Sequence, residues 1–110
     1  MKLIFVCSPL AGDIEANQAK ARKYCRFVME QGNVPFAPHL LFPQFSDDNN
    51  PSERKAGIDM GLFVLEFCSE LWCFGPDISP GMKIEIEKAG KTLGIPIRRF
   101  SADCEEVAFQ

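Results

Sequence analysis

The sequence is poor in the residues that build metal sites and disulfide frameworks. It contains a single histidine, His39, and no cysteine or carboxylate stands at ligand spacing around it, which argues against a structural zinc site. The five cysteines form no C-x-x-C pair, and an odd number without a pattern is typical of a reducing compartment. We therefore expect a cytoplasmic protein that needs neither a metal nor a cofactor.

Long apolar runs and an excess of positive charge are also missing. The run Leu3–Cys7 is too short for the hydrophobic region of a signal peptide, and no stretch approaches the roughly 18 apolar residues of a membrane span. Twelve lysines and arginines stand against 15 aspartates and glutamates, a net charge of −3. Such a chain offers no basic surface to a nucleic acid polymer. The partners that we expect are small molecules or other proteins, away from membranes.

The residues that are present suffice for one domain over residues 1–110, because 46% of them are hydrophobic and can form an ordinary core. Short apolar runs alternate along the chain with longer segments of helical periodicity. They predict strands over residues 3–7, 34–37, 71–74 and 95–97, and helices over residues 14–31, 52–68 and 80–93.

Buried strands that alternate with helices of this length are typical of βαβ units. We predict an α/β fold of three layers, with a flavodoxin-like or Rossmann-like parallel sheet of four to five strands flanked by helices. In such sheets ligands bind beyond the carboxyl ends of the strands. The loops expected at that edge are residues 8–13, 38–50 and 75–79.

The helix after the third strand begins at this edge. Ser79 is a suitable N-cap and Pro80 a suitable first helical residue. At about 100° per residue, Glu85 falls in the second turn beside the apolar stripe that packs on the sheet. Its carboxylate is either hydrogen-bonded to a neighbouring loop or a nucleophile or general base. Glu87, flanked by lysines at i−4 and i+4, is predicted to be a surface charge.

The second helix carries apolar residues on two sides. The two stripes are Ile58, Leu62 and Leu65, and Met60, Phe63, Val64 and Phe67. The first is predicted to cover the sheet. The second lies either against another subunit, which favours a homo-oligomer, or under the apolar segment 40–45. Asp59 stands between the stripes.

Two further polar residues are placed near the ligand edge. Asn17 projects from the inward side of the first helix, where its partner is either a loop carbonyl or a bound ligand. His39 follows the second strand and either serves in packing and hydrogen bonding or moves protons near neutral pH. Both are candidates for substrate binding.

Four segments are informative when taken together. They are Leu3-Ile4-Phe5-Val6-Cys7-Ser8-Pro9-Leu10 with Gly12-Asp13, then Pro38-His39-Leu40, then Glu70-Leu71-Trp72-Cys73-Phe74-Gly75, and finally Ile78-Ser79-Pro80-Gly81-Met82-Lys83-Ile84-Glu85. Over about residues 2–100 the chain resembles the nucleoside 2-deoxyribosyltransferase-like superfamily, and more narrowly a short branch of it.

In that superfamily a glutamate four residues after a glycine, at the start of the helix that follows the third strand, attacks the anomeric carbon of the deoxyribosyl group. Gly81 and Glu85 match this spacing, so the resemblance implies that Glu85 is the catalytic nucleophile, as in retaining glycosidases. The residues expected to bind the substrate are Ser8, Pro9, Leu10, Gly12, Asn17, His39, Asp59, Ser79, Gly81 and Met82.

The chain departs from the superfamily's pattern at three positions that concern the base and its protonation. Ser79 and Ser69 stand where characterised transferases carry aspartates, and Asp59 lies two residues away from where a third falls. We therefore predict a nucleoside or nucleotide N-deoxyribosyltransferase or N-glycosidase, and keep two alternatives: a non-catalytic nucleotide-binding module, and an oligomeric scaffold without a ligand. For a 5′-monophosphate, Ser8, Ser79 and the first amides of the third helix would form an anion site. In characterised relatives a neighbouring subunit completes the pocket.

Overall fold

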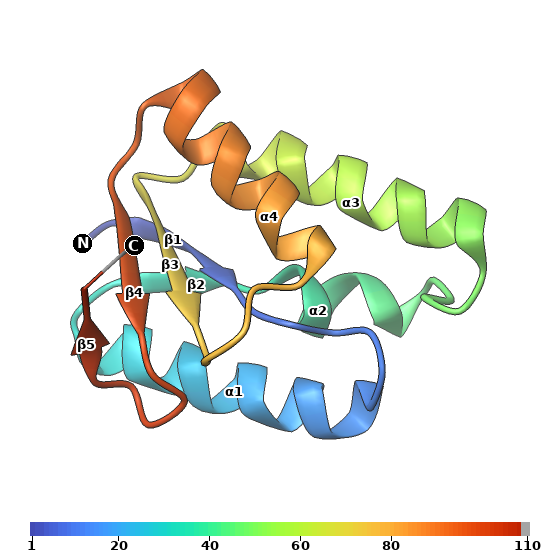
Figure 1. Ribbon diagram of the computed structural model, residues 1–110, viewed down its shortest axis with the longest axis horizontal. Helices are drawn as coiled ribbons and strands as arrows, with labels where there is room; N and C mark the ends of the chain where they lie inside the picture. The colour runs from blue at the N-terminus through green and yellow to red at the C-terminus, as the bar shows by residue number, and fades with distance from the viewer. Residues whose placement is uncertain (109–110) are drawn as a thin grey trace.

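The computed structural model describes residues 1–108 and has the predicted α/β architecture (Figure 1). The strands form one sheet in the order β2-β1-β3-β4-β5, which is the flavodoxin-like order. The strands are β1 (Leu3–Cys7), β2 (Val34–Phe36), β3 (Glu70–Phe74), β4 (Ile97–Phe100) and β5 (Glu106–Val107). The helical elements are α1 (Ile14–Glu30), α2 (Pro38–Leu41), the 3₁₀ turn η1 (Phe42–Gln44), α3 (Pro51–Leu65), α4 (Pro80–Glu87) and the π-helical segment η2 (Lys88–Leu93).

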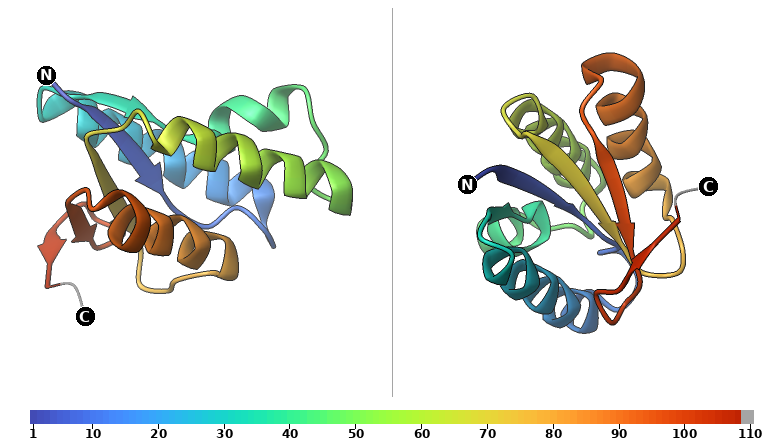
Figure 2. Two further views of the ribbon diagram at one scale, coloured as in Figure 1. Left: turned by 90° about the horizontal axis from the view of Figure 1, so that it is seen from above. Right: turned by 90° about the vertical axis from the view of Figure 1, so that its left-hand side faces the viewer.

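The sheet separates two apolar clusters, because successive side chains of a strand point to opposite faces. Ile4, Val6, Trp72 and Phe74 pack on the α1 side, whereas their neighbours in β1 and β3 pack on the side of α3 and α4: Phe5, Cys7, Leu71 and Cys73. Figure 2 shows α1 on one face and the pair α3 and α4 on the other. The predicted three-layer arrangement is therefore confirmed.

The end of the chain differs from the prediction. The fourth strand spans Ile97–Phe100 instead of residues 95–97, because the Ile95 amide donates to the Ala89 carbonyl and so belongs to the end of η2. β5 pairs antiparallel with β4 and was not predicted. Arg98 is accommodated in a strand because its guanidinium lies 4.6 Å from the centre of the Trp72 ring and bonds to Glu106.

The segment predicted as the loop 38–50 is partly helical. It contains α2 and η1, and each has a proline at one of its first two positions, Pro38 in α2 and Pro43 in η1, where a missing amide hydrogen costs little. Phe42 in this segment is buried. These two short helices bring the chain beneath α3, on the carboxyl side of β2, and so form one wall of the site described below (Figure 1).

The second apolar stripe of α3 is only partly covered. Met60 and Val64 are half-buried, whereas Phe63 and Phe67 are 63% and 67% exposed and have ring centres 5.5 Å apart. The segment 40–45 therefore does not cover these two rings. That a partner subunit covers them remains a prediction.

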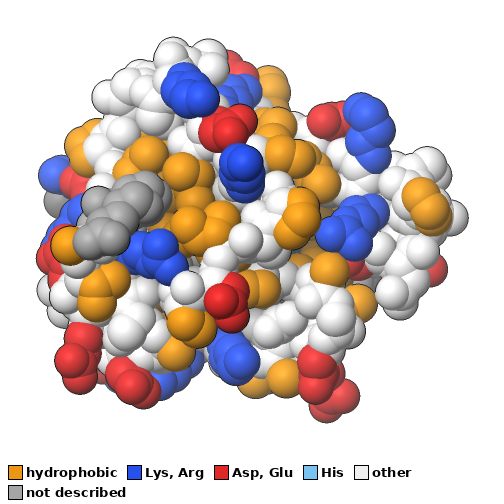
Figure 3. Space-filling view, viewed as in Figure 1, with side chains coloured by type: hydrophobic (Ala, Val, Ile, Leu, Met, Phe, Trp, Pro, Cys, Tyr) orange, Lys and Arg blue, Asp and Glu red, His pale blue; other side chains and the backbone are white. Residues whose placement is uncertain are grey.

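The rest of the described surface is mixed in charge. Basic and acidic side chains are interspersed on the face in Figure 3, with no continuous basic area there. Within residues 1–108, every helix is too short or too polar to cross a membrane.

Candidate active site

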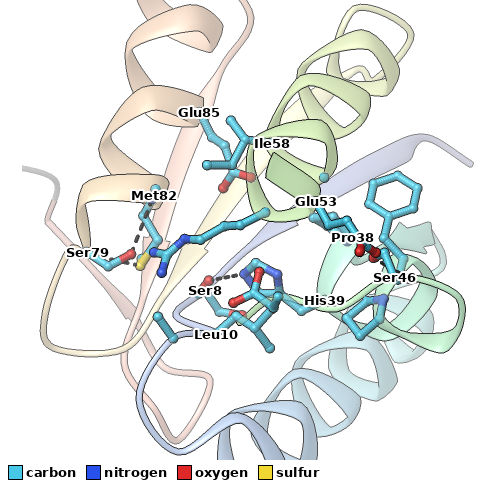
Figure 4. A pocket seen from close by; sticks show the side chains of 17 residues that line it. Ser8, Leu10, Pro38, His39, Ser46, Glu53, Ile58, Ser79, Met82 and Glu85 are labelled. Atoms are coloured by element: carbon cyan, nitrogen blue, oxygen red, sulfur yellow. Dashed lines mark hydrogen bonds between the residues drawn. The ribbon is translucent and has the colours of Figure 1, made fainter. Parts of the chain in front are cut away.

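A cavity opens at the carboxyl edge of the sheet, on the side of α3 and α4. Residues from six parts of the chain line it, and Figure 4 shows several of them converging from opposite sides. The β1–α1 loop contributes Ser8 and Leu10, α2 contributes His39, and the start of α4 contributes Gly81 and Met82. The remaining lining residues are Ala11, Pro38, Phe42, Pro43, Ser46, Asp48, Glu53, Arg54, Gly57, Ile58, Ser79 and Glu85. The cavity thus combines apolar walls with a small number of polar groups, as ligand sites do.

Glu85 is the buried carboxylate of this cavity. It lies on α4 and is 5% exposed, and its side chain points from α4 toward the interior of the site (Figure 4). α3 passes close to it at Gly61, where a Cβ would lie 3.8 Å from Glu85 Oε2, at ordinary contact distance. Burial raises the pKa of Glu85 to about 7, and a hydrogen bond from Cys7 opposes this rise in part.

Cys7, the last residue of β1, supplies that hydrogen bond. Its thiol donates to Glu85 Oε1 across 3.3 Å. Burial raises the pKa of the Cys7 thiol well above its ordinary value, so the sulfur keeps its proton and acts as a donor. Cys73 is the register partner of Cys7 on β3, and both are fully buried. The thiol therefore fixes one carboxylate oxygen and leaves the other available to the cavity.

His39 forms part of the cavity wall and organises the loop after β1. Its ring Nε2 lies 2.6 Å from the Ser8 carbonyl oxygen, and since a carbonyl only accepts, Nε2 carries the proton. Burial lowers the pKa of His39 below its ordinary 6.5, although the bond to Ser8 opposes this. The ring is consequently neutral at pH 7. The backbone carbonyl of His39 accepts a hydrogen bond from the Gln18 side chain.

The mouth of the cavity is formed by the start of α4. Ser79 caps the helix, as predicted, with its side chain accepting from the Met82 amide at 3.3 Å. The Met82 side chain is buried beneath this turn. Facing it, the hydroxyl of Ser8 is buried and has no hydrogen-bond partner within residues 1–108. An unpaired buried hydroxyl is costly, and it marks a place where a ligand oxygen or a water molecule is accommodated.

Four of the residues predicted to bind substrate do not line this cavity. Asn17 donates to the carbonyls of Leu10 and Ala11, so it holds the β1–α1 loop in place, which is the structural alternative considered above. With Pro9 it lines a second hollow, on the α1 side of the sheet edge. Gly12 forms the turn of the same loop with φ of +98°. Asp59 lies on the exposed flank of α3, where it pairs with Lys55.

Several lining residues were not predicted, and the most informative are charged. Arg54, Glu53 and Asp48 reach the cavity from the first turn of α3 and the loop before it. The sequence contains a signal for their position, because Asn50 and Pro51 are a typical N-cap and first helical residue. Asn50 indeed accepts from the amides of Ser52 and Glu53. Within the described part of the chain, no group of three or more histidine, cysteine or acidic residues is arranged to hold a metal ion.

The fold is similar to that of solved 2-deoxyribosyltransferases. A 2-deoxyribosyltransferase of Bacillus psychrosaccharolyticus, described as a biocatalyst for nucleoside synthesis, superposes with a TM-score of 0.71 at 17% identity, over 98% of this chain and 85% of that one. A 2-deoxyribosyltransferase of Leishmania mexicana gives a TM-score of 0.62 at 19% identity, over 92% of this chain and 65% of that one. The fold is thus nucleoside 2-deoxyribosyltransferase-like.

The family follows from the sequence itself. The chain belongs to the family described as "Domain of unknown function (DUF7768)", whose profile matches residues 2–100. No curated protein sequence matches the chain.

Proposed function

We propose that the protein breaks the bond between base and deoxyribose in a nucleoside or nucleotide, as an N-deoxyribosyltransferase or an N-glycosidase, with Glu85 as the nucleophile. The observation that carries this proposal is the Glu85 carboxylate itself. It is buried in the cavity at the carboxyl edge of the sheet, and its hydrogen-bond partner within residues 1–108 is the Cys7 thiol alone. The 2-deoxyribosyltransferase-like fold supports the same chemistry.

The reaction is a double displacement at the anomeric carbon. A Glu85 oxygen forms a bond to C1′ while the bond from C1′ to the base nitrogen breaks, and the base leaves with the electron pair and takes a proton from water. In the second step a nitrogen of an acceptor base, or a water oxygen, attacks C1′, releases the carboxylate and gives its proton to the hydroxide left by the first step. Only ionised Glu85 performs the first step, and with a pKa of about 7 about half of the molecules are ready at neutral pH.

The environment of Glu85 suits this chemistry. Burial makes the carboxylate less well solvated and therefore a better nucleophile toward a positively charged, oxocarbenium-like centre. The Cys7 bond fixes the orientation of the carboxylate. The apolar residues Leu10, Phe42 and Ile58 line the same cavity, and they offer faces against which a base or sugar packs.

The test is to incubate the protein with deoxynucleosides and deoxynucleoside 5′-monophosphates, with and without a free acceptor base, and to separate the bases by chromatography. We expect base release or exchange that falls at least about 1,000-fold in Glu85→Ala, since the variant removes the nucleophile. Glu87→Ala is the matched control, because Glu87 is an exposed glutamate on the same helix. Equal rates for the wild type and Glu85→Ala would refute the assignment of Glu85 as the nucleophile. A mass increase equal to one deoxyribosyl group on Glu85 would identify the ester directly.

A non-catalytic nucleotide-binding module is the second candidate. It is favoured by the positions of the residues at the three sites of departure: Asp59 is paired with Lys55 on the surface, Ser69 is exposed, and Ser79 offers a hydroxyl where the superfamily has a carboxyl group. Saturable binding of a nucleotide without any release or exchange of base would select this candidate.

A further inference from the structure

We propose, resting on the function proposed above, that the preferred substrates carry a 5′-monophosphate and that Arg54, with the first turn of α4 and the Ser8 hydroxyl, binds that phosphate. The cavity is lined by one guanidinium, one helix N-terminus with a free amide and one unpaired hydroxyl. All three groups donate hydrogen bonds, so one kind of ligand suits them all. That ligand is an oxyanion held on the sugar at a fixed distance from Glu85.

Arg54 is the cationic group of the site. It lines the cavity together with Ser79 and Gly81, and no carboxylate of the described chain lies within ion-pair distance of it. The cations that do form ion pairs within residues 1–108 are Lys2, Lys23, Arg26, Lys55, Lys88 and Arg98. Arg54 is exposed, so it lies at the rim of the cavity, and without a carboxylate partner it is available to a ligand in a protein whose net charge is −3. Its planar fork of donors matches a phosphate group.

The start of α4 adds backbone donors. Pro80 has no amide hydrogen, and the Met82 amide is taken by the Ser79 side chain, so the Gly81 amide is the free donor of this turn. Gly81 lines the cavity, and a Cβ built on it would meet no atom within 4 Å, so the space beside its Cα is open. Amides at a helix N-terminus, with the positive end of the helix dipole, are a common phosphate site.

The Ser8 hydroxyl is the independent sign of a ligand. Ser8 is 2% exposed and lines the cavity, and its hydroxyl oxygen lacks a partner within residues 1–108. A hydroxyl in this situation donates to an acceptor that enters the cavity. The phosphate oxygens supply that acceptor at the point where the β1–α1 loop faces α4.

The spacing between the phosphate site and the nucleophile fits one substrate class. Gly81 precedes Glu85 by four residues on α4, which corresponds to about 6 Å along a helix. In a deoxynucleoside 5′-monophosphate the phosphorus is five bonds from C1′, which spans about 6 Å in a bent chain of about 1.5 Å bonds. A phosphate at the start of α4 therefore leaves C1′ beside the Glu85 carboxylate.

Two acidic residues restrict where the phosphate lies. Asp48 and Glu53 also line the cavity, from the loop before α3 and its first turn. The Glu53 carboxylate is held by the Asp47 amide at 3.0 Å. Both disfavour an anion on their side, so the phosphate is assigned to the α4 side of the mouth and the base to the side of α2.

The experiment compares kcat/KM for deoxynucleoside 5′-monophosphates and for the corresponding deoxynucleosides. We expect the wild type to favour the monophosphates by at least about tenfold, and Arg54→Gln to lower this preference about 10- to 100-fold, as loss of a charge-assisted hydrogen-bond pair does. Arg22→Gln is the matched control, because Arg22 is exposed on α1 and lines neither described cavity. A wild type that prefers the unphosphorylated nucleoside, or an Arg54→Gln variant with an unchanged preference, overturns the proposal.

A binding measurement separates this proposal from the chemistry. Calorimetry on Glu85→Ala, with a deoxynucleoside 5′-monophosphate, the deoxynucleoside and inorganic phosphate as probes, needs no turnover. Binding that requires both nucleoside and phosphate, and that weakens in Glu85→Ala/Arg54→Gln, supports the phosphate site even when the wild type shows no base release. Inorganic phosphate that binds as tightly as the monophosphate overturns the assignment to a nucleotide. Turnover without any phosphate preference supports the proposed function and refutes only the phosphate site.

Discussion

Replacing Glu85 by glutamine is expected to stabilise the protein at neutral and alkaline pH while abolishing turnover. Glu85 is 5% exposed, and burial raises its pKa from 4.5 to about 7. In the unfolded chain the carboxyl group loses its proton near pH 4.5, whereas in the folded protein it keeps the proton until about pH 7. Ionisation therefore destabilises the fold progressively between these two values, and the full cost is present above pH 7.

The magnitude follows from the same two pKa values. Each tenfold change in an acid dissociation constant corresponds to about 1.4 kcal/mol, so a pKa of about 7 in place of 4.5 corresponds to about 3 kcal/mol. Glutamine has nearly the same shape and no charge, and its side-chain oxygen still accepts from Cys7. The free energy of unfolding of Glu85→Gln should therefore match the wild type near pH 4 and exceed it by about 3 kcal/mol at pH 8.

Urea unfolding at pH 4 and pH 8 measures this difference. Glu87→Gln, on the exposed side of α4, is the control and should stay within about 0.5 kcal/mol of the wild type at both pH values. A difference between Glu85→Gln and the wild type that does not grow with pH would refute the reasoning, because it would mean that Glu85 is not a strained buried acid.

Three further predictions concern other parts of the structure. The Cys7 bond lowers the pKa of Glu85, so in Cys7→Ala the rise of kcat/KM with pH should move to higher pH, and Cys7→Ser should restore its position; identical profiles for wild type and Cys7→Ala contradict this. Phe100 is 2% exposed and packs against Trp72 and Phe74, so Phe100→Ala should cost about 3–5 kcal/mol in urea unfolding, whereas exposed Phe67→Ala should cost under about 0.5 kcal/mol. If Phe63 and Phe67 lie in a homo-oligomer interface, Phe63→Ser/Phe67→Ser should lower the mass measured by sedimentation without lowering stability per chain; a wild type that is monomeric at all concentrations contradicts the interface.

Much of the fold could be predicted from the sequence, because its strands are short, apolar and bounded by glycine, proline and polar residues. β1 and β3 are buried on both faces and read as continuous apolar runs. The start of α4 was also predictable, since Ser79 and Pro80 form a local signal that needs no tertiary context. β5 could not be predicted, because a strand of only two residues depends on pairing with β4. It also depends on Cys104, whose φ of 63° is not indicated by any turn residue in the sequence.

The candidate site was predictable only in part, for a different reason. The helical register places Glu85 beside the apolar stripe, but its burial also depends on α3, which approaches it at Gly61. The periodicity of one helix does not show where a second helix packs against it. Arg54 was missed although Asn50 and Pro51 mark the start of α3, because one helix start does not show which side chains of its first turn face a cavity formed by other elements. Asp59 was considered on the basis of the resemblance, whereas its side chain pairs with Lys55 four residues earlier on the same helix.

The hydrogen bond between Cys7 and Glu85 joins residues 78 positions apart in the chain. Neither β1 nor α4 can form this bond alone, so it exists only where the two segments are packed together. In the unfolded chain Glu85 is an ordinary exposed acid. The pKa of this one side chain is consequently a measure of whether two distant parts of the chain have come together.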